Sequence, residues 1–506
     1  MILFSGCTLL NSTSFNLLSQ SIGDDDGFAS LSVRFNTTGR ITVKMNGPIG
    51  VLYEEEFFKG IHDAIMHLDG YRQTPHGGIY FLRVFDENEN MIFENEMTFA
   101  EPSLEIDDVD LLWWEEGDTL ALVGAQVTAV NRGDLPVYPY EIVVDLGAFE
   151  ETGNTLPMVV LPNQEKLVNA CMYRSGVSAA SRITETSVRS SDNEGLGQFS
   201  EDVKPEENVD ELVFSWRYQG SQVMRVPELE FLYDYYVGLD RFLSEDYAAY
   251  IFDVYDDPYI ELLAAELLER TTMVDVVGRI NFIASFAQDI RYATDDDSDP
   301  TCAEYPRFPV ELLVDGQGDC EDKAILTAAI LDEIGIEVAL LRLPNHMAVG
   351  VHLPEDATTF DYYLDEYYFL ETTRNRWVVG KVPDEYVGLT NASAYPLISR
   401  PILLHTWDDA TRFTTSDGSD YVRLNIIVEN IGSGAALNFE VQGAFYSSGN
   451  QSRNPGNVIV YGLDPGVKDE VRLELDVPQG ITTILKTKVV LDDVVVHEKE
   501  STSTFP

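Results

Sequence analysis

Residues 318–334 read GDCEDKAILTAAILDEI, and they decide how the middle of this chain is interpreted. Large apolar residues recur there at helical spacing, and a glycine follows, so the stretch predicts a helix that begins at Cys320. The free N–H groups of a first helical turn and the helix dipole favour a thiolate over a thiol. Cys320 is therefore the candidate nucleophile of the chain.

Three carboxylates flank this cysteine in sequence: Asp319, Glu321 and Asp322. If they point at the thiol, they raise its pKa and oppose thiolate formation. If they cap the helix start and face away, they stabilise the helix instead. The sequence leaves both arrangements open.

Two further groups complete a set of reactive side chains. Residues 344–352 (PNHMAVGVH) predict a strand in which His346 and His352 share a face with small residues. These two histidines lie roughly 20 Å apart along such a strand, so only one can partner the cysteine. Residues 367–373 (YYFLETT) predict an aromatic strand in which Glu371 needs a partner such as a histidine N–H, because burying a lone carboxylate is costly. Cysteine, histidine and carboxylate in this order are the parts of a thiol acyl-transfer site.

The sequence around these three groups resembles the transglutaminase-like cysteine-hydrolase superfamily, particularly its archaeal branch. The resemblance implies that Cys320 is the nucleophile, His346 the base and Glu371 the orienting carboxylate. It also implies cleavage or transfer of peptide or amide acyl groups through a cysteine thioester. Many relatives carry aspartate, proline and threonine where this chain has ETT at 371–373. The resemblance covers about 212–390 and rests on 214–218 (FSWRY), 256–260 (DDPYI), 308–313 (FPVELL), 318–322 (GDCED), 344–351 (PNHMAVGV), 367–373 (YYFLETT) and 377–383 (WVVGKVP).

The remaining site predictions concern oxyanion donors and metals. The backbone N–H of Cys320 is the expected oxyanion donor, as at other nucleophiles that begin a helix. Gln317 is either a second donor or a plain turn residue. His62 and His67 are five residues apart, which does not place two metal ligands on one helical face. No metal and no cofactor are expected, because the chain carries no glycine-rich phosphate loop and no metal-spaced motif.

Two segments share one β-rich plan. Residues 125–133 (AQVTAVNRG) and 421–432 (YVRLNIIVENIG) each contain an alternating strand that ends in Asn-x-Gly, and a second alternating strand follows. We expect the Asn-x-Gly to supply residues that tolerate positive φ at a tight connection. Both segments resemble the small immunoglobulin-like adhesion modules of archaeal and bacterial surface proteins.

These patterns predict a multidomain α+β chain. A central papain/transglutaminase-like α+β domain, with the cysteine-bearing helix packed on an antiparallel sheet, is flanked by β-sandwich domains. Within the first β-rich domain, residues 54–68 predict a short helix. The expected segments are a lipoprotein tether or disordered segment at 1–26, a β-rich domain at 27–101, an Ig-like β-sandwich at 102–174, an acidic Ser-rich linker at 175–210, the catalytic domain at 211–402, an Ig-like β-sandwich at 403–500 and a tail at 501–506.

The charge of the chain restricts its partners. The chain has 86 acidic and 33 basic residues, a net charge of -53, so it will not seek nucleic acid or an anionic membrane surface. A high-salt habitat, an acidic proteome and a plain solubility surface each explain this charge. Four cysteines are too few for a disulfide framework.

The N-terminal residues suggest a location. Residues 1–7 end in a pattern similar to a lipobox, which makes Cys7 a lipidation candidate, although the basic region and the longer apolar stretch of a signal are missing. We expect an extracellular or cell-surface enzyme with a lipid anchor, acting on a protein or peptide substrate, with surface partners bound by the β modules. A cytoplasmic location stays open. The alternative function is that of a non-catalytic adhesion or assembly protein.

Overall fold

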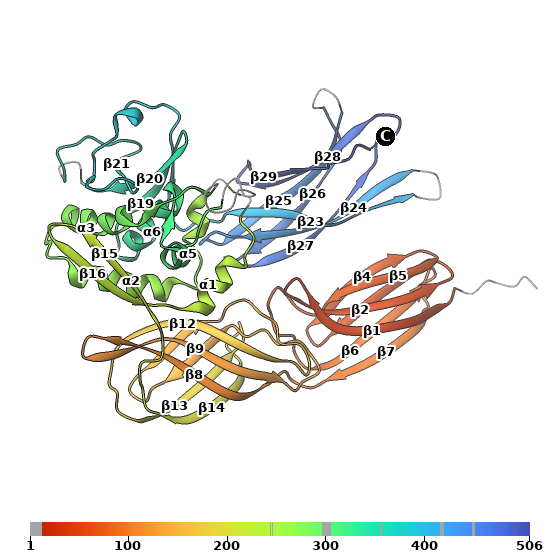
Figure 1. The fold of residues 1–506 in the computed structure, drawn as a ribbon. Coiled ribbons are helices and arrows are strands. Elements are labelled where there is room, and N and C mark those ends of the chain that lie inside the picture. Colours follow the sequence, from red (N-terminus) through yellow and green to blue (C-terminus); the bar gives the residue numbers. More distant parts are fainter. Residues whose placement is uncertain are drawn as a thin grey trace, which may run out of the picture. The chain divides into compact units, whose positions relative to one another are not determined.

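The computed structural model describes residues 13–242, 244, 246–295, 305–354, 357–414, 419–447 and 451–505. The chain divides into two compact units, Met1–Glu207 and Asn208–Pro506 (Figure 1). Strands account for 52% of the structure and helices for 14%. No helix among the described residues is long and apolar enough to cross a membrane.

The predicted α+β class is wrong. The chain is mostly β and consists of many small antiparallel sheets, and the described residues show no central papain-like α+β domain. The α-helices that the structure describes fall between Glu230 and Glu333, whereas strands occur in every other part of the chain. Helical spacing is thus a local property of one segment, and period-two alternation governs the rest.

The first unit begins with two sheets that share one core. Sheet order is β1-β2-β5 in one and β4-β3-β6-β7 in the other. Alternate residues of β2, β3, β5 and β6 point inward and form the buried core. The strands are β1 (Phe15–Asp25), β2 (Phe28–Thr37), β3 (Ile41–Gly47), β4 (Gly50–Phe57), β5 (Gly60–His67), β6 (Gly78–Asp86) and β7 (Met91–Phe99).

A second pair of sheets completes the first unit. Their orders are β12-β9-β8 and β11-β10-β13-β14, and their inner faces contribute to a second apolar core. The strands are β8 (Leu104–Glu116), β9 (Thr119–Asn131), β10 (Glu141–Asp145), β11 (Glu150–Asn154), β12 (Glu165–Val177), β13 (Arg182–Arg189) and β14 (Gly195–Val203).

Three segment predictions for this unit are wrong. The acidic linker predicted at 175–210 forms β13 and β14, because a strand with one inward face needs few large apolar residues; Thr184, Thr186 and Val188 fill that face. The tether predicted at 1–26 contains β1, which pairs with β2. The helix predicted at 54–68 is instead the end of β4 and all of β5. Cys7 lies outside the described residues.

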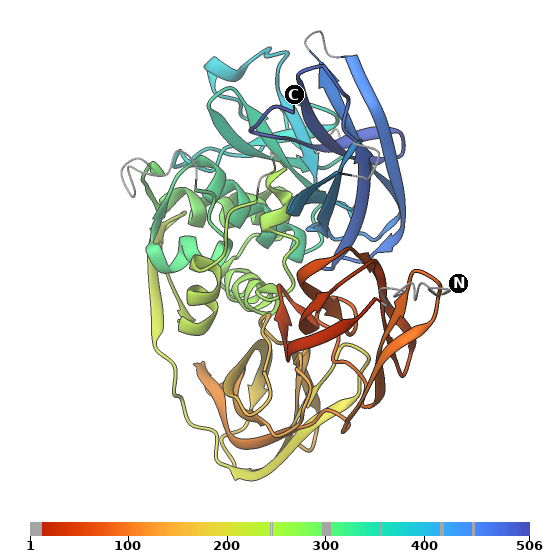
Figure 2. The same ribbon diagram turned by 90° about the vertical axis from the view of Figure 1, so that its right-hand side faces the viewer.

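The second unit opens with the segment that carries all the described α-helices (Figures 1 and 2). α6 packs on α2, α3 and α5 and on the sheet β21-β20-β19-β22. All residues from Glu321 to Leu331 are buried, so α6 is held on every side and its first residue has a fixed place. The elements are β15 (Glu211–Arg217), β16 (Ser221–Pro227), α1 (Glu230–Val237), η1 (Tyr247–Tyr250), α2 (Asp257–Arg270), α3 (Val276–Asp289), β17 (Arg291–Tyr292), α5 (Pro309–Asp315), β18 (Gln317–Gly318), α6 (Cys320–Glu333), β19 (Val338–Leu343), β20 (His346–His352), β21 (Tyr367–Leu370), η2 (Asp384–Tyr386) and β22 (Ser393–Pro396).

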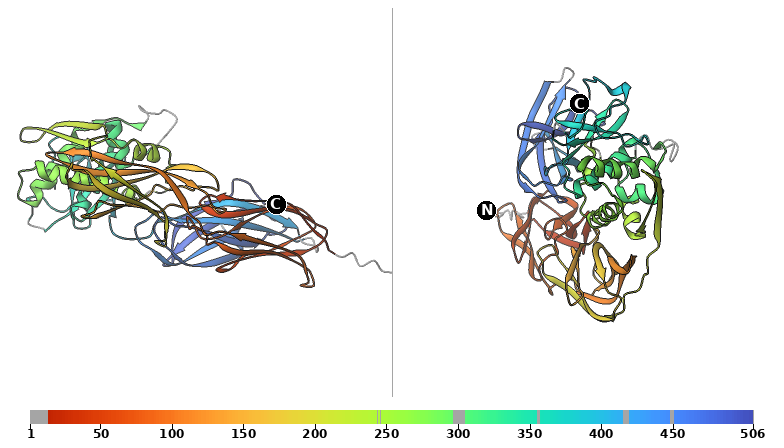
Figure 3. Two further views of the ribbon diagram at one scale, coloured as in Figure 1. Left: turned by 90° about the horizontal axis from the view of Figure 1, so that it is seen from below. Right: turned by 90° about the vertical axis from the view of Figure 1, so that its left-hand side faces the viewer.

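The C-terminal strands form a sandwich, drawn in blue in Figure 3. Sheets β23-β24-β27 and β26-β25-β28-β29 enclose one apolar core. Phe505 pairs with Thr483 and packs against this core, so the tail predicted at 501–506 is wrong as far as Phe505. The strands are β23 (Leu403–Thr414), β24 (Asp420–Asn430), β25 (Ala436–Ser447), β26 (Gln451–Leu463), β27 (Lys468–Asp476), β28 (Thr483–Leu491) and β29 (Val494–Glu500).

The two Asn-x-Gly segments adopt the same corner in different sandwiches. Asn131 donates to the carbonyls of Leu135 and Val160 at 2.8 and 2.7 Å. Asn430 donates to the carbonyls of Gly434 and Leu463 at 2.8 and 3.0 Å. Both asparagines are fully buried, and each side-chain oxygen accepts from the backbone N–H two residues on. The expectation of positive φ is wrong, since neither the asparagines nor the following glycines adopt it; side-chain hydrogen bonds hold the corner.

Candidate functional site

The start of α6 is fixed by a buried arginine. Arg307 Nη1 lies 2.8 Å from Asp322 and 3.0 Å from Asp295, and Arg307 Nε lies 3.1 Å from Asp315. Asp322 also accepts the backbone N–H of Asp319 at 3.1 Å, which caps the helix. Burial raises the pKa of Asp322 to about 6, although Arg307 acts in the opposite direction. This network fixes the first turn of α6 and with it the position of Cys320.

Gly318 lets the chain pass close to this network. A Cβ at Gly318 would lie 2.7 Å from Leu312 and would collide with the side chain of Asp322. The residues before the nucleophile therefore need a glycine for close approach rather than for an unusual φ.

The Cys320 thiol has one hydrogen-bond partner among the described contacts. Its Sγ donates to Glu321 Oε2 at 3.1 Å. The backbone N–H of Met347, at the start of β20, lies close enough to the sulfur to act in the direction of a lower thiol pKa. Burial raises the pKa of the thiol well above its ordinary range, and the carboxylates of Glu321 and Asp319 raise it further. The resting group is a neutral thiol, because these effects outweigh the helix start.

The three flanking carboxylates thus divide between the two arrangements that the sequence left open. Asp322 caps the helix, whereas Glu321 points at the thiol. Burial raises the pKa of Asp319 to about 10, and the neighbouring Glu321 carboxyl raises it further. The ligand atoms of Asp319, Cys320 and Glu321 lie within 4.8 Å of one another, close enough to contact one metal ion.

His346 and Glu371 form the second half of the site. His346 Nε2 lies 3.2 Å from Glu371 Oε2, and the Glu371 side chain is fully buried. The other carboxylate oxygen accepts the backbone N–H of Thr373 at 2.8 Å and the Thr373 hydroxyl. Burial acts to raise the pKa of Glu371, but the hydrogen bonds from His346 and Thr373 outweigh it and lower that pKa. The carboxylate is therefore ionised and oriented toward the imidazole.

The structure brings the three predicted residues to one place. Cys320 contacts Met347, the neighbour of His346 in sequence, and α6 packs on β20. Tyr386 stacks on the His346 ring at 5.0 Å with an interplanar angle of 5°. The charges of Glu371 and Cys320 both act on Tyr386. The described contacts contain no hydrogen bond between Cys320 and His346, since the thiol proton is directed at Glu321.

The other predicted residues lie away from the thiol contacts. His352 is at the far end of β20, where its Nδ1 lies 3.1 Å from Glu337. Gln317 belongs to β18, and its backbone pairs with Arg291 of β17. An oxyanion role for Gln317 stays a prediction.

Three supporting residues escaped the sequence analysis. Tyr386 comes from η2, which carries no motif, so no signal in the sequence could have found it. Gln288 Nε2 donates to the carbonyls of Glu371 and Trp377 at 2.8 and 3.1 Å, and it fixes the end of β21. Lys323 is fully buried one turn after Cys320, and burial lowers its pKa to about 8. A lysine directly before the apolar run 324–326 is a visible signal for a buried polar contact.

Comparisons with known proteins leave the chain without an assigned family. No family model matches the chain, and no curated protein matches it. Among solved structures, a red sea bream transglutaminase covers 74% of this chain and 79% of its own at 10% identity and a TM-score of 0.18. A tetra-tandem repeat from the extending region of a large adhesion protein covers 97% of this chain and 98% of its own at 9% identity and a TM-score of 0.17.

A third similar structure is the YadV chaperone, which covers 38% of this chain and 100% of its own at 8% identity and a TM-score of 0.14. These neighbours include a transglutaminase and an adhesion-protein repeat. The β-rich structure agrees with the sandwich part of the prediction. At TM-scores of 0.14 to 0.18, none of these similarities assigns an activity to the chain.

Proposed function

We propose that this chain is a transglutaminase-like thiol enzyme that cleaves or transfers peptide or amide acyl groups through a thioester on Cys320. One observation carries the proposal: the backbone N–H of Met347 lies close enough to the Cys320 sulfur to influence the thiol pKa, and the preceding residue, His346, is held by the buried carboxylate of Glu371. This arrangement supports the roles of nucleophile, base and orienting carboxylate at the place where α6 packs on β20.

The proposed reaction starts with a change of hydrogen-bond partner. The thiol turns from Glu321 to the imidazole of His346, which takes the S–H proton as the sulfur attacks the carbonyl carbon. The C–N bond of the tetrahedral adduct then breaks, and the imidazolium gives its proton to the leaving amine. Water or a second amine attacks the thioester and releases Cys320 as a thiol.

Each remaining residue has one role in this scheme. Glu371 stabilises the imidazolium and fixes the ring orientation. The N–H of Met347 stabilises negative charge on sulfur, and the N–H of Cys320 is the proposed oxyanion donor. Tyr386 covers one face of the imidazole ring and limits its rotation.

The alternative proposal is a non-catalytic adhesion or assembly protein. The observation that favours it is the exposed apolar surface of the C-terminal sandwich: Val494, Val495 and Val496 are consecutive on the edge strand β29 and are 60%, 48% and 42% exposed. Exposed apolar residues on a sheet edge are typical of pairing surfaces. The net charge of -53 supports a partner that is neither nucleic acid nor an anionic membrane. A cell-surface location belongs to both proposals.

Mass spectrometry of the acyl-enzyme tests the proposed function. The chain is mixed with a p-nitrophenyl ester of a short blocked peptide, and the rate of acyl transfer to Cys320 is followed at pH 7.5. We expect the His346→Ala variant to react at least about 100-fold more slowly, because it lacks the base. His352→Ala, on the same strand, serves as the matched control and reacts normally. Equal rates in the wild type and His346→Ala would overturn the thiol-enzyme proposal and favour the adhesion protein.

A further inference from the structure

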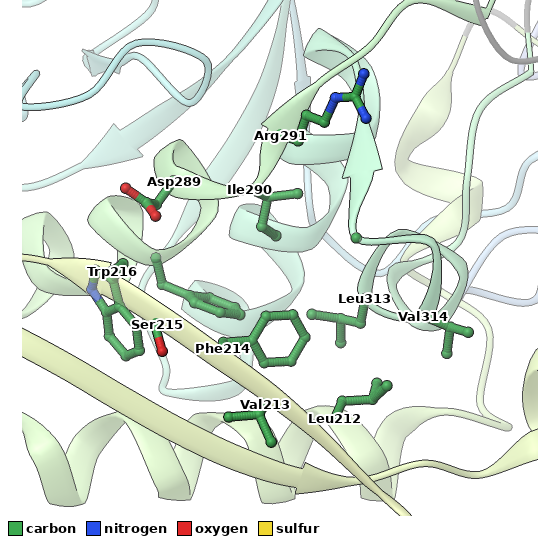
Figure 4. A pocket seen from close by; sticks show the side chains of 12 residues that line it. Leu212, Val213, Phe214, Ser215, Trp216, Asp289, Ile290, Arg291, Leu313 and Val314 are labelled. Atoms are coloured by element: carbon green, nitrogen blue, oxygen red, sulfur yellow. The ribbon is translucent and has the colours of Figure 1, made fainter.

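One cavity of the second unit lies beside an unpaired strand edge. It has a volume of about 350 Å³ and is lined by five consecutive residues of β15, Leu212 to Trp216. The opposite wall comes from the end of α3, from β17 and from the end of α5 (Figure 4). Five consecutive residues of one strand can line a cavity only if the backbone edge of the strand faces it, because side chains alternate between the two faces.

That edge of β15 is open for pairing. β15 pairs with β16 in a two-stranded sheet, and among the described residues no backbone hydrogen bond engages residues 212–216 on the other side. Phe214 and Trp216 anchor the strand to α3 through ring contacts with Phe286, with ring centroids 5.2 and 5.3 Å apart. The edge is thus held rigidly while its free N–H and C=O groups face the cavity.

Only a short stretch of polypeptide separates the cavity lining from Cys320. Gly316 lines the cavity, and the extended residues Gln317 and Gly318 lead directly to Asp319 and the nucleophile. Four residues of extended chain span at most about 14 Å. Tyr292, the β17 neighbour of the cavity residue Arg291, is close enough to Cys320 that the thiol, after burial, contributes to raising the pKa of the tyrosine to about 12.

We propose that this cavity binds an extended polypeptide, which adds to the free edge of β15 and places one apolar side chain between Phe214 and Leu313. This inference rests on the proposed function, and it assigns the binding position of the substrate. Main-chain hydrogen bonds to β15 supply affinity without sequence preference, and the apolar walls select the inserted side chain. Because Gly316 lies at most about 14 Å from Cys320, the reacting carbonyl lies no more than about four residues from that side chain.

Binding is tested without chemistry in the full-length Cys320→Ala chain. The probe is a blocked glycine–serine peptide with one leucine, and the control is the same peptide with N-methylated backbone amides around that leucine. We expect the leucine peptide to slow amide hydrogen exchange in residues 211–217 and the methylated peptide to have no effect. No protection of β15 by the leucine peptide would overturn the proposal.

A cavity-filling variant provides the second readout. Val314 is partly buried in the cavity wall, so Val314→Trp fills the space, whereas Val314→Ala enlarges it. We expect Val314→Trp to weaken binding of the leucine peptide at least tenfold and Val314→Ala to preserve it. Unchanged affinity in a folded Val314→Trp chain would contradict the inference; if this variant fails to fold, hydrogen exchange in the unsubstituted cavity decides.

The position of the reacting group separates this inference from the proposed function. Peptide esters with the leucine two, four or six residues from the ester are offered to the chain with Cys320 intact. We expect acylation of Cys320 to be faster at a spacing of two or four residues than at a spacing of six. Acylation that is independent of spacing overturns the cavity assignment and leaves the enzyme standing. Binding to β15 without any acylation overturns the enzyme and leaves a peptide-binding site.

Discussion

His346 and His405 are both largely buried histidines, and their surroundings differ in charge. His346 faces the ionised carboxylate of Glu371 at 3.2 Å. His405, on β23, faces the ring of His497 at 2.7 Å between the Nδ1 atoms and the Thr487 hydroxyl at 2.8 Å. Burial, followed by His497 and Lys499, lowers the pKa of His405 to about 3. His405 is therefore kept neutral, whereas His346 has a negatively charged hydrogen-bond partner.

The comparison shows that burial alone does not identify a functional histidine. Desolvation disfavours the imidazolium form of His405, and its partners carry no negative charge. At His346 the partner is a carboxylate that the backbone N–H of Thr373 holds in place. A second histidine and a hydroxyl offer no negative charge at His405, so that ring is part of the sandwich core.

The largest expected effect comes from removing the negative charge that distinguishes the partner of His346 from the partners of His405. Glu371→Gln replaces the carboxylate with an amide of the same shape and gives His346 a neutral partner, as His405 has. We expect the rate of acyl transfer to Cys320 to fall at least about 100-fold, because the imidazolium loses its counter-charge. The rate is measured by mass spectrometry with the peptide ester.

Glu385→Gln is the matched control for this substitution. Glu385 is an exposed carboxylate adjacent to Tyr386, and it pairs with Arg374 rather than with the imidazole. Its substitution is expected to leave the rate within about twofold. Equal losses in both variants would show that the general negative potential matters and that the specific contact of Glu371 does not.

The second prediction concerns the pH dependence of stability. His405 in the unfolded chain has a pKa near 6.5, and in the folded chain it has a pKa of about 3. Below pH 6.5 the unfolded state therefore binds the additional proton, and stability falls by about 1.4 kcal/mol for each pH unit until the folded pKa is reached. We expect the C-terminal sandwich to lose about 2 kcal/mol between pH 7 and pH 5.

Urea unfolding measures this loss, with the folded fraction of β23 read by a hydrogen-exchange pulse at one fixed pH. His405→Leu removes the titrating group, so the difference between wild type and variant isolates it from the general effect of acid on a chain of net charge -53. His497, whose pKa burial also lowers, contributes in the same direction. His352→Gln, at an exposed histidine paired with Glu337, is the control. The same pH slope in wild type and His405→Leu would contradict the assignment.

Local patterns predicted the elements around the site better than the class of the chain. The helix expected to begin at Cys320 is α6, and the strand expected within 344–352 is β20. The periodicity of apolar residues and the glycine that follows a helix determine such elements locally. The α+β class failed because one helical segment was given the weight of the whole chain.

Two other failures have physical causes. Residues 54–68 contain apolar residues at spacings that fit a helix, but Gly60 adopts a φ of 148° and joins two strands there. The segment at 175–210 lacked large apolar residues, and threonines fill the inner face of β13. In both cases strand pairing with distant segments decides the structure, and such pairing leaves no local signal.

The sequence predicted two alternative roles for the carboxylates beside Cys320 and could not decide between them. The sequence showed that acidic neighbours of Cys320 could either cap the helix or face the thiol, and Asp322 and Glu321 each do one of these. The choice depends on Arg307, which lies 13 positions before Cys320 in sequence and draws Asp322 away from the thiol. Tertiary contacts of this kind cannot be read from spacing.

The smallest expected effect concerns the Cys320 thiol and the carboxylate beside it. Glu321→Gln removes the carboxylate that accepts the thiol proton and raises the thiol pKa, so that pKa falls. We expect iodoacetamide to label Cys320 about tenfold faster at pH 7.5, which corresponds to one pKa unit. In the wild type the labelling rate should rise about tenfold per pH unit up to pH 9, because the thiol stays protonated, whereas a free thiol levels off above about 8.5.

The control for Glu321→Gln lies on the same helix. Glu333→Gln changes the net charge equally but sits at the other end of α6, so labelling should be unchanged. If both variants accelerate labelling equally, the thiol responds to the net charge of the chain and Glu321 has no special role. If only Glu321→Gln accelerates it, this carboxylate holds Cys320 in its neutral resting state. A charged neighbour then acts on the thiol as well as on His346, whereas the hydrogen-bond partners of His405 are uncharged.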